Sequence, residues 1–131
     1  MSIDPIWISE ALALAMHERQ LAEHGGLSGV RDAGLLSSAL MRPQQKFHYG
    51  ESSFLKLAAA YAFGIARNHP FLDGNKRTAY VVMRTFLILN GWDIVASQEE
   101  KYLTMIRLAE GALEEDALVD WLRRVVIELP K

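Results

Sequence analysis

Residues 69–80, HPFLDGNKRTAY, follow a strongly apolar segment, residues 54–68 (FLKLAAAYAFGIARN), and lead into a second one, residues 77–90 (RTAYVVMRTFLILN). Both segments are apolar on nearly every helical face, which predicts two helices that are buried on most sides. Pro70 and the Asp-Gly-Asn run between them are typical of a tight turn. We therefore expect an antiparallel helix pair at the centre of the fold, with the polar turn held at both ends by the core.

Helix signals dominate the rest of the chain. Ser9, Asp32 and Ser97 are suitable N-caps, and glycines at 25–26 and 111 are suitable helix ends. Pro43 should end the second helix, because proline lacks the N–H group that a helix interior needs. Six helices with almost no strand predict an all-α bundle that forms one domain over residues 1–131. The four further helices are expected at about 9–24, 32–42, 97–110 and 118–129.

Two of these helices carry more specific expectations. Ser97 and Glu100 have the spacing of a capping box, in which each side chain binds the other residue's N–H group. In the same helix one face should carry Tyr102, Met105, Ile106 and Ala109. In the last helix the apolar face should carry Leu118, Trp121, Leu122, Val125 and Leu129.

Two short segments are expected to be irregular or extended. In residues 43–51, PQQKFHYGE, Phe47 and Tyr49 alternate with polar residues as they would in a small strand. Residues 92–97, WDIVAS, should be a short extended connector. The sequence therefore predicts a helical bundle with one short extended flap.

Composition excludes several classes of protein. The net charge is −2, so no overall basic surface indicates nucleic-acid binding. The chain contains no cysteine, which excludes disulfides and thiolate metal sites. No apolar run approaches the ~18 residues that a membrane span needs. The N-terminal residues lack the basic start and apolar core of a signal peptide, so we expect a cytoplasmic protein that binds neither nucleic acid nor membrane.

The turn itself has the chemistry of an anion site. A helix that begins near Asn75 has unpaired N–H groups and partial positive charge at its first turn. Gly74 would let an oxygen-rich ligand approach the backbone closely. Lys76 and Arg77 oppose the helix dipole there, so they are poor choices for helix stability alone. Their presence favours a bound anion such as a phosphate chain, which arginine can bind through two hydrogen bonds.

Two further residues of the turn indicate a reaction. Asp73 would repel a phosphate unless a divalent cation lay between them, and Mg²⁺ is commonly held by one or two carboxylates together with substrate phosphates. His69 ends the preceding helix, and a neutral imidazole there could accept a proton from an incoming hydroxyl group. Transfer of a phosphorus-centred group from a nucleotide to a hydroxyl is the reaction that these residues suggest.

The nine residues HPFLDGNKR, 69–77, resemble the signature of the Fic superfamily, His-Pro-Phe-x-Asp/Glu-Gly-Asn-Gly/Lys-Arg. Residues 23–44, EHGGLSGVRDAGLLSSALMRPQ, also resemble that superfamily, and the lysine at 76 with the short chain resembles its Doc (death-on-curing) toxins. The resemblance implies a Fic-fold bundle with ATP and Mg²⁺ as cofactors. It implies these roles: His69 as catalytic base, Phe71 as core anchor, Asp73 as Mg²⁺ ligand, Gly74 and Asn75 as anion hole, and Arg77 as phosphate ligand.

Position 76 separates two activities within the superfamily. Members with glycine there resemble AMP-transferases, whereas Doc-like members have lysine and resemble kinases that bind the nucleotide in the reverse orientation. Lys76 would fill the space that glycine leaves open and attract the terminal phosphates. The resemblance thus implies transfer of the ATP γ-phosphate to a threonine or serine of a target protein, namely translation elongation factor Tu. Two alternatives stay open: AMP transfer, and an idle module that only binds a nucleotide.

Regulation and acceptor binding are also implied by the resemblance. Many Fic proteins carry an inhibitory helix with the pattern Ser/Thr-x-x-x-Glu-Gly/Asn, and no serine or threonine of this chain has glutamate four residues later. We therefore expect restraint by a separate antitoxin protein. Residues 43–51 occupy the place of the flap that aligns the target, and we weigh that role evenly against an ordinary connector. His17, His24 and His48 are interpreted as caps or solvated side chains, and Arg84 is left outside the site.

Overall fold

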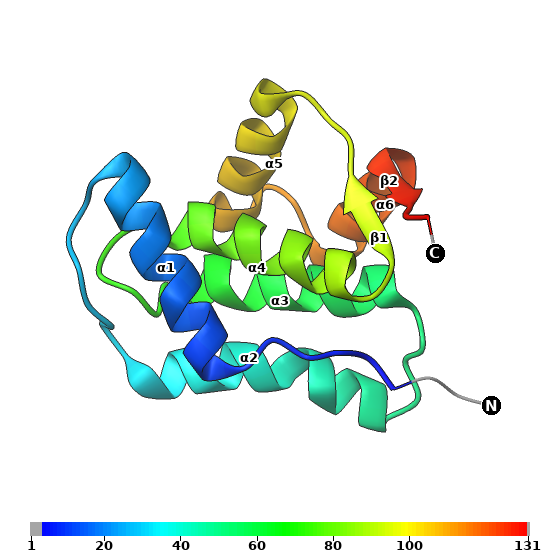
Figure 1. The fold of residues 1–131 in the computed structure, drawn as a ribbon, viewed down its shortest axis with the longest axis horizontal. Helices are drawn as coiled ribbons and strands as arrows, with labels where there is room; N and C mark the ends of the chain where they lie inside the picture. Colours follow the sequence, from blue (N-terminus) through cyan, green and yellow to red (C-terminus); the bar gives the residue numbers. More distant parts are fainter. Residues whose placement is uncertain (1–3, 131) are drawn as a thin grey trace.

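The computed structural model describes residues 4–130 and contains six helices within that range. The expected all-α class and the number of helices are therefore confirmed, together with a two-stranded antiparallel sheet. In chain order the elements are α1 (Glu10–His24), α2 (Ala33–His48), α3 (Phe54–Asn68), α4 (Asn75–Leu89), β1 (Trp92–Ile94), α5 (Gln98–Glu110), α6 (Glu115–Val125) and β2 (Val126–Glu128) (Figure 1).

Helix α3 lies at the centre of the bundle and contacts α2, α4, α5 and α6. Residues 57–62 of α3 are fully buried, and four of these six are alanines, so neighbouring helices can approach closely. A Cβ atom added to Gly64 would lie 3.1 Å from Cα of Ala39 in α2, so the two backbones touch there. Helix α4 returns along α3 (Figure 1), which confirms the expected central pair.

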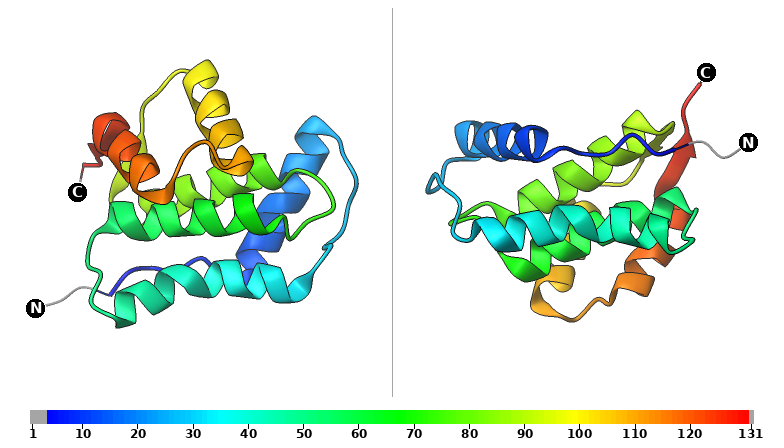
Figure 2. Two further views of the ribbon diagram at one scale, coloured as in Figure 1. Left: turned by 180° about the vertical axis from the view of Figure 1, so that it is seen from behind. Right: turned by 90° about the horizontal axis from the view of Figure 1, so that it is seen from below.

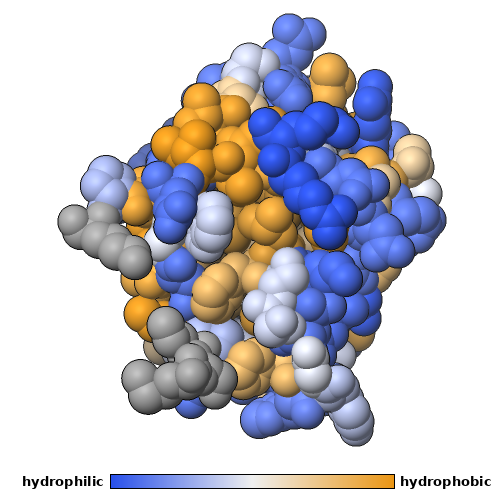
Figure 3. Space-filling view, turned by 90° about the vertical axis from the view of Figure 1, so that its right-hand side faces the viewer, coloured by the Kyte–Doolittle hydropathy of each residue, from blue (hydrophilic) through white to orange (hydrophobic). Residues whose placement is uncertain are grey.

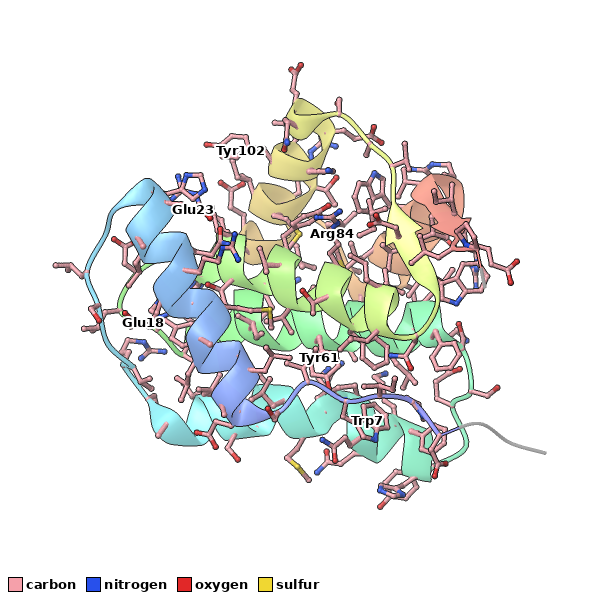
Figure 4. All side chains as sticks on the ribbon, in the orientation of Figure 1. Trp7, Glu18, Glu23, Tyr61, Arg84 and Tyr102 are labelled. Carbon is pink, nitrogen blue, oxygen red and sulfur yellow. The ribbon has the colours of Figure 1, made fainter. Side chains whose placement is uncertain are left out.

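The segment before α1 crosses the bundle and is tied to its interior. The N–H group of Ile8 donates to the hydroxyl of buried Tyr61 at 3.0 Å, and burial raises the pKa of Tyr61 to about 12 (Figure 4). Asn90, just beyond α4, accepts from the N–H group of Ile6 at 2.8 Å and donates to its carbonyl at 3.0 Å. The start of the chain is thereby attached to the end of α4.

Side-chain caps explain where several helices begin. Ser9, Asp32, Ser53 and Ser97 each accept a hydrogen bond from the N–H group three residues later. Only one of the two hydrogen bonds of the expected capping box forms. The Glu100 N–H group donates to the Ser97 hydroxyl, whereas the Glu100 carboxylate accepts from the indole N–H group of Trp121 at 2.8 Å. The expected apolar face of α5 is also wrong in part: Tyr102 is exposed, and the buried residues are Thr104, Met105 and Leu108.

The expectation that residues 43–51 are irregular or extended is wrong for residues 43–48. Helix α2 continues through Pro43 to His48, so Lys46 and Phe47 are helical and cannot form an extended flap. An interior proline costs a helix ~3 kcal/mol, and packing of the following turn offsets that cost. Pro43 is itself buried, the Phe47 ring packs edge-on against Trp7, and Lys46 pairs with Glu115.

The last helix also ends earlier than expected. Helix α6 stops at Val125, and Val126–Glu128 pair with Trp92–Ile94 as β2 with β1, so Leu129 is not helical. The N–H group of Val95 donates to the carbonyl of Val125 at 2.7 Å, and this hydrogen bond joins the end of α6 to the residue after β1. Three successive β-branched residues at 125–127 favour the extended conformation once partners are available.

The face shown in Figure 3 has apolar areas beside polar ones. Val95, just after β1, and Ile127 of β2 are exposed apolar residues. Within residues 4–130 no helix combines the length and hydropathy needed to cross a bilayer. At the opposite end of the bundle, the 25–32 connector and the 69–74 loop lie side by side (Figures 1 and 2).

Candidate active site at the start of α4

His69 is the C-cap of α3, as its position in the sequence suggested. Its φ of 48° and ψ of 56° place it in the left-handed region, and no other non-glycine residue between 4 and 130 has a positive φ. This conformation costs a residue with a side chain roughly 1–2 kcal/mol. It turns the chain sharply out of α3 at the residue expected to act as base.

Arg31 holds this turn from outside the signature. Its Nε donates to the carbonyl of His69 and a terminal guanidinium nitrogen donates to the carbonyl of Asn68, both at 2.7 Å. These carbonyls belong to the last turn of α3, where no backbone N–H group is left to bind them. A positive charge at a helix C-terminus also interacts favourably with the helix dipole. Arg31 therefore stabilises the unusual backbone at His69.

The connector between α1 and α2 pairs with the loop through several of its backbone groups. The N–H groups of Arg31 and Asp32 donate to the carbonyl of Pro70, and the N–H group of Leu72 donates to the carbonyl of Gly29. Residues 30 and 71 form an antiparallel bridge. On the other side of the connector, the hydroxyl of Ser28 donates to Glu18 of α1, which is labelled in Figure 4. Residues 25–32 are thus the extended segment that borders the candidate site.

Asn75 closes the turn with its side chain. Its amide oxygen accepts from the N–H group of Phe71 and its amide nitrogen donates to the Phe71 carbonyl, both at 2.9 Å. Phe71 is 1 % exposed, so its expected burial in the core is confirmed. Because the Asn75 side chain is engaged with the turn, its main-chain N–H group is the part of Asn75 that could meet an anion.

The first turn of α4 has features that favour a bound anion. Gly74, the N-cap, has a φ of 75° and provides no side-chain hydrogen bond, and the first turn contains no acidic residue. The first N–H groups of the helix therefore keep their partial positive charge. Lys76 and Arg77 are exposed at the same place. A negatively charged ligand would be stabilised by both the dipole and the two cations.

Asp73 stands beside this helix end as a carboxylate. One carboxylate oxygen accepts from the N–H group of Gly74 at 2.8 Å, and the other accepts from the N–H group of Leu27 at 3.2 Å. The Leu27 hydrogen bond, followed by the Gly74 hydrogen bond and the nearby charge of Arg77, lowers the pKa of Asp73 below its ordinary value. Asp73 is therefore ionised near neutral pH.

The surroundings of Asp73 fit a Mg²⁺ ion that takes most of its ligands from elsewhere. Each carboxylate oxygen accepts one N–H group and keeps a further lone pair. Within residues 4–130 no three histidine, aspartate or glutamate side chains form a cluster suited to a metal ion. Mg²⁺ accepts such a site, because it keeps several waters and binds substrate phosphates beside one or two carboxylates.

His17 was interpreted from the sequence as a cap or a solvated side chain, and that interpretation is wrong. The side chain is 1 % exposed, its ring stacks on Phe71 at 3.8 Å, and Nε2 lies 2.8 Å from the carbonyl oxygen of Asp73. The helical spacing offered a signal, since His17 follows buried Ala13 by four residues in α1.

His24 and His48 are exposed as expected. Arg84 forms an ion pair with Asp93.

Two surface cavities lie elsewhere. The larger, about 570 Å³, is lined by residues of α2 and the turn after it, and the smaller, about 140 Å³, lies between α2 and α3. Neither is lined by any of residues 69–77. We place the candidate site by its chemistry and not by concavity, because an exposed helix N-terminus binds anions without a deep pocket.

The sequence-predicted site residues therefore lie together at one end of the central helix pair. His69 caps α3, Asp73 and Gly74 lead into α4, and residues 75–77 form the first turn of that helix. Sequence reasoning missed Arg31 and His17, which contact the loop from the 25–32 connector and from α1. The arrangement joins a histidine, an ionised aspartate and an uncapped helix N-terminus with two cations within nine residues.

Comparison with known proteins identifies the family of this chain. Residues 7–87 match the family model described as Fic/DOC family. The chain is 34% identical over 119 residues to "Protein kinase doc" of Escherichia phage P1, covering 90% of this chain and 94% of that protein. It is 47% identical over 75 residues to "Toxin Doc" of Mycolicibacterium smegmatis, covering 55% of this chain and 57% of that protein. The chain therefore belongs to the Fic/Doc family.

Proposed function

We propose that this protein is a Doc-like toxin that transfers the γ-phosphate of ATP to a threonine or serine hydroxyl of a target protein. The observation that carries the proposal is Lys76 in the uncapped first turn of α4, one residue before Arg77 and three after ionised Asp73. Two cations at an uncapped helix end suit the terminal phosphates of a nucleotide. The phage relative bears the name of a protein kinase, which agrees with this choice over AMP transfer.

In the proposed reaction His69 accepts the proton of the acceptor hydroxyl. The hydroxyl oxygen then forms a bond to the γ-phosphorus, the bond between that phosphorus and the β–γ bridging oxygen breaks, and ADP leaves. Lys76, Arg77 and the free N–H groups at the start of α4 stabilise the charge on the phosphate oxygens. Arg31 fixes the main chain of His69, so the base stays at one position relative to the helix end.

Asp73 is the residue that would hold Mg²⁺. The bound ion would neutralise phosphate charge and help to orient the nucleotide. The two N–H groups that Asp73 accepts hold its carboxylate in one orientation and keep it ionised. The pairing of Asp73 with Leu27 also connects the ligand position to the 25–32 connector.

The proposed function also requires an acceptor protein and an antitoxin that restrains the toxin. The target implied by the family resemblance is elongation factor Tu, acting in the cytoplasm, and an antitoxin protein would restrain the toxin. Because residues 43–48 are helical, the extended 25–32 connector is the better candidate for aligning an acceptor segment. Leu27, Val30 and Leu72 are exposed apolar residues on this side and could contact such a segment.

Mass spectrometry of the acceptor protein tests the proposal directly. After incubation with ATP and Mg²⁺, elongation factor Tu should gain ~80 Da for phosphate, whereas ~329 Da would indicate AMP transfer. His69→Ala should abolish the gain, while His48→Ala, a change at an exposed histidine on α2, should keep it. Lys76→Gly should reduce the preference for phosphate transfer, because it removes the charge that favours the terminal phosphates.

Cell growth separates the enzyme from an idle nucleotide-binding module. Expression of the parent protein without its antitoxin should arrest growth, and His69→Ala should be tolerated. Growth arrest that persists in the His69→Ala strain at equal protein level would show that toxicity comes from binding, which contradicts the proposed chemistry.

A further inference from the structure

We propose that His17 is a positioning residue that orients the peptide group between Asp73 and Gly74 and thereby the anion-binding end of α4. As a statement about catalysis this rests on the proposed function, but the orientation of the peptide group can be tested without it. His17 lies in α1, 56 residues before Asp73, and is outside the family signature.

The contacts of His17 converge on three positions of the signature loop. Its ring stacks on Phe71, with centroids 3.8 Å apart and planes 8° apart. Its Nε2 lies 2.8 Å from the carbonyl oxygen of Asp73. A Cβ atom added to Gly74 would lie 3.8 Å from two atoms of the ring, so the imidazole also borders the N-cap of α4.

The hydrogen bond fixes the tautomer of His17. A carbonyl oxygen can only accept, so Nε2 must carry the proton and donate it. Burial of a polar ring costs free energy unless its groups find partners, and this donor finds one. Leucine or phenylalanine would fill the same buried position of α1 without that cost. The polar group is therefore explained by its partner in the loop rather than by packing.

The same peptide group is held from its other side as well. Its carbonyl belongs to Asp73 and accepts from His17, while its N–H group belongs to Gly74 and donates to the Asp73 carboxylate at 2.8 Å. Glycine adopts positive and negative φ with similar ease, so the peptide before Gly74 could otherwise rotate. Gly74 has a φ of 75° and sets the direction in which α4 begins. Loss of the His17 donor would release that peptide group.

Two substitutions separate the donor from the ring. His17→Gln keeps an N–H donor that can reach the Asp73 carbonyl but loses the aromatic ring. His17→Phe keeps a ring on Phe71 but loses the donor. His48→Gln and His48→Phe are the matched controls, since His48 is exposed at the end of α2.

We expect His17→Phe to lower kcat for phosphate transfer ~10–100-fold, as loss of a supporting hydrogen bond at a ligand residue typically does. KM for the acceptor protein should stay unchanged, because the affected group serves the nucleotide. His17→Gln should recover most of the lost kcat, and both His48 variants should match the parent protein. Equal kcat in His17→Phe and the parent, or an equal loss in His17→Gln and His17→Phe, would overturn the role of the donor.

A measurement on the unmodified protein covers the case in which a variant fails to fold. Long-range ¹⁵N–¹H NMR spectra of the imidazoles should show the proton of His17 on Nε2. In His17→Phe, the amide signals of Gly74 and Asn75 should shift while those around His48 do not. A His17 ring protonated on Nδ1 alone would refute the proposal. These spectra need no substrate, so they test the orientation of the peptide group even if no phosphate transfer is detected.

Discussion

The two connectors on either side of α2 look similar in sequence but are held in different ways. Residues 25–32 and residues 49–53 are both short, polar and rich in glycine or serine. The backbone hydrogen bonds of the second connector reach back no further than Gln45. The first connector instead binds residues 68–73, more than thirty-five positions later, through main-chain and side-chain groups.

This difference decides which connector belongs to the candidate site. The alternation of Phe47 and Tyr49 suggested that the segment after Pro43 was the extended one. In the structure Tyr49 is 92 % exposed in a turn, whereas Val30 pairs with Phe71 of the loop. Alternation reports only on neighbouring residues, so it cannot reveal a partner that is distant in the sequence. Extended structure here follows from a backbone partner and not from the local pattern.

The largest expected effect compares one glycine in each connector. Gly26 and Gly50 have φ values of +127° and +103°, so alanine at either position should cost roughly 1–3 kcal/mol of strain. Only at Gly26 would the new Cβ atom also meet another group, 2.8 Å from the Asp73 carboxylate. Gly26→Ala should therefore lower phosphate transfer ~10–100-fold, as disturbed support of a ligand residue does, while Gly50→Ala should not.

Urea unfolding and acceptor phosphorylation, measured on both glycine variants, check this prediction. The control is Gly50→Ala itself, because nothing lies within 4 Å of the added atom there. Equal losses of activity in the two variants would show that the clash with Asp73 has no consequence.

A smaller effect is expected from one cation in each connector region. Arg31→Met removes two hydrogen bonds from the carbonyls of Asn68 and His69, which should cost on the order of 1 kcal/mol of stability. Lys56→Met removes only a surface pair with Glu51 at 3.5 Å, and such pairs contribute ~0–1 kcal/mol. Because Arg31 supports the backbone of His69, the proposed base, its variant should also lose activity.

Thermal unfolding and phosphorylation rates of Arg31→Met and Lys56→Met provide the measurement. We expect reduced kcat in the Arg31 variant alone. If the Lys56 variant lost as much activity, the two connectors would be equivalent and the comparison would fail.

The smallest expected effect concerns an ion pair outside both connectors and shows how much an ordinary ion pair contributes to stability. Arg84, labelled in Figure 4, donates to Asp93, and this contact, followed by the Ile94 N–H group, lowers the pKa of Asp93. A lowered folded-state pKa stabilises the protein above the unfolded value of about 3.9, and the contribution disappears as pH falls through the folded value. Asp93→Asn should therefore lower stability by ~0.2–1 kcal/mol at neutral pH.

Melting temperatures of the parent protein and Asp93→Asn between neutral pH and pH 2 check the sign. The difference between them should be steady near neutral pH and shrink toward zero in acid. A difference that grew on acidification would contradict the direction of the Asp93 pKa shift.

Local signals in the sequence predicted much of the fold. Ser9, Asp32 and Ser97 act within three residues of themselves, so their caps could be located from the sequence. The central helix pair followed from apolar segments on both sides of a polar turn. The order of the candidate site residues followed as well, because all of them lie on that one turn.

Features that depend on distant partners could not be predicted in the same way. Pro43 indicated a helix end, but packing of the next turn against Trp7 and Glu115 keeps the chain helical. The strand β2 depends on β1, more than thirty residues earlier. His17 and Arg31 contact the loop only because α1 and the connector after it fold back onto it. Each of these features needs a tertiary contact that no local pattern contains.

The two asparagines at the ends of α4 have a mechanical consequence. Asn75 binds both backbone groups of Phe71 in the loop that leads into α4, and Asn90 binds both backbone groups of Ile6 in the segment before α1. Hydrogen bonds at both ends should restrict sliding and tilting of α4. The helix dipole should therefore already be oriented when a negatively charged ligand binds at the first turn, so little reorganisation energy is needed.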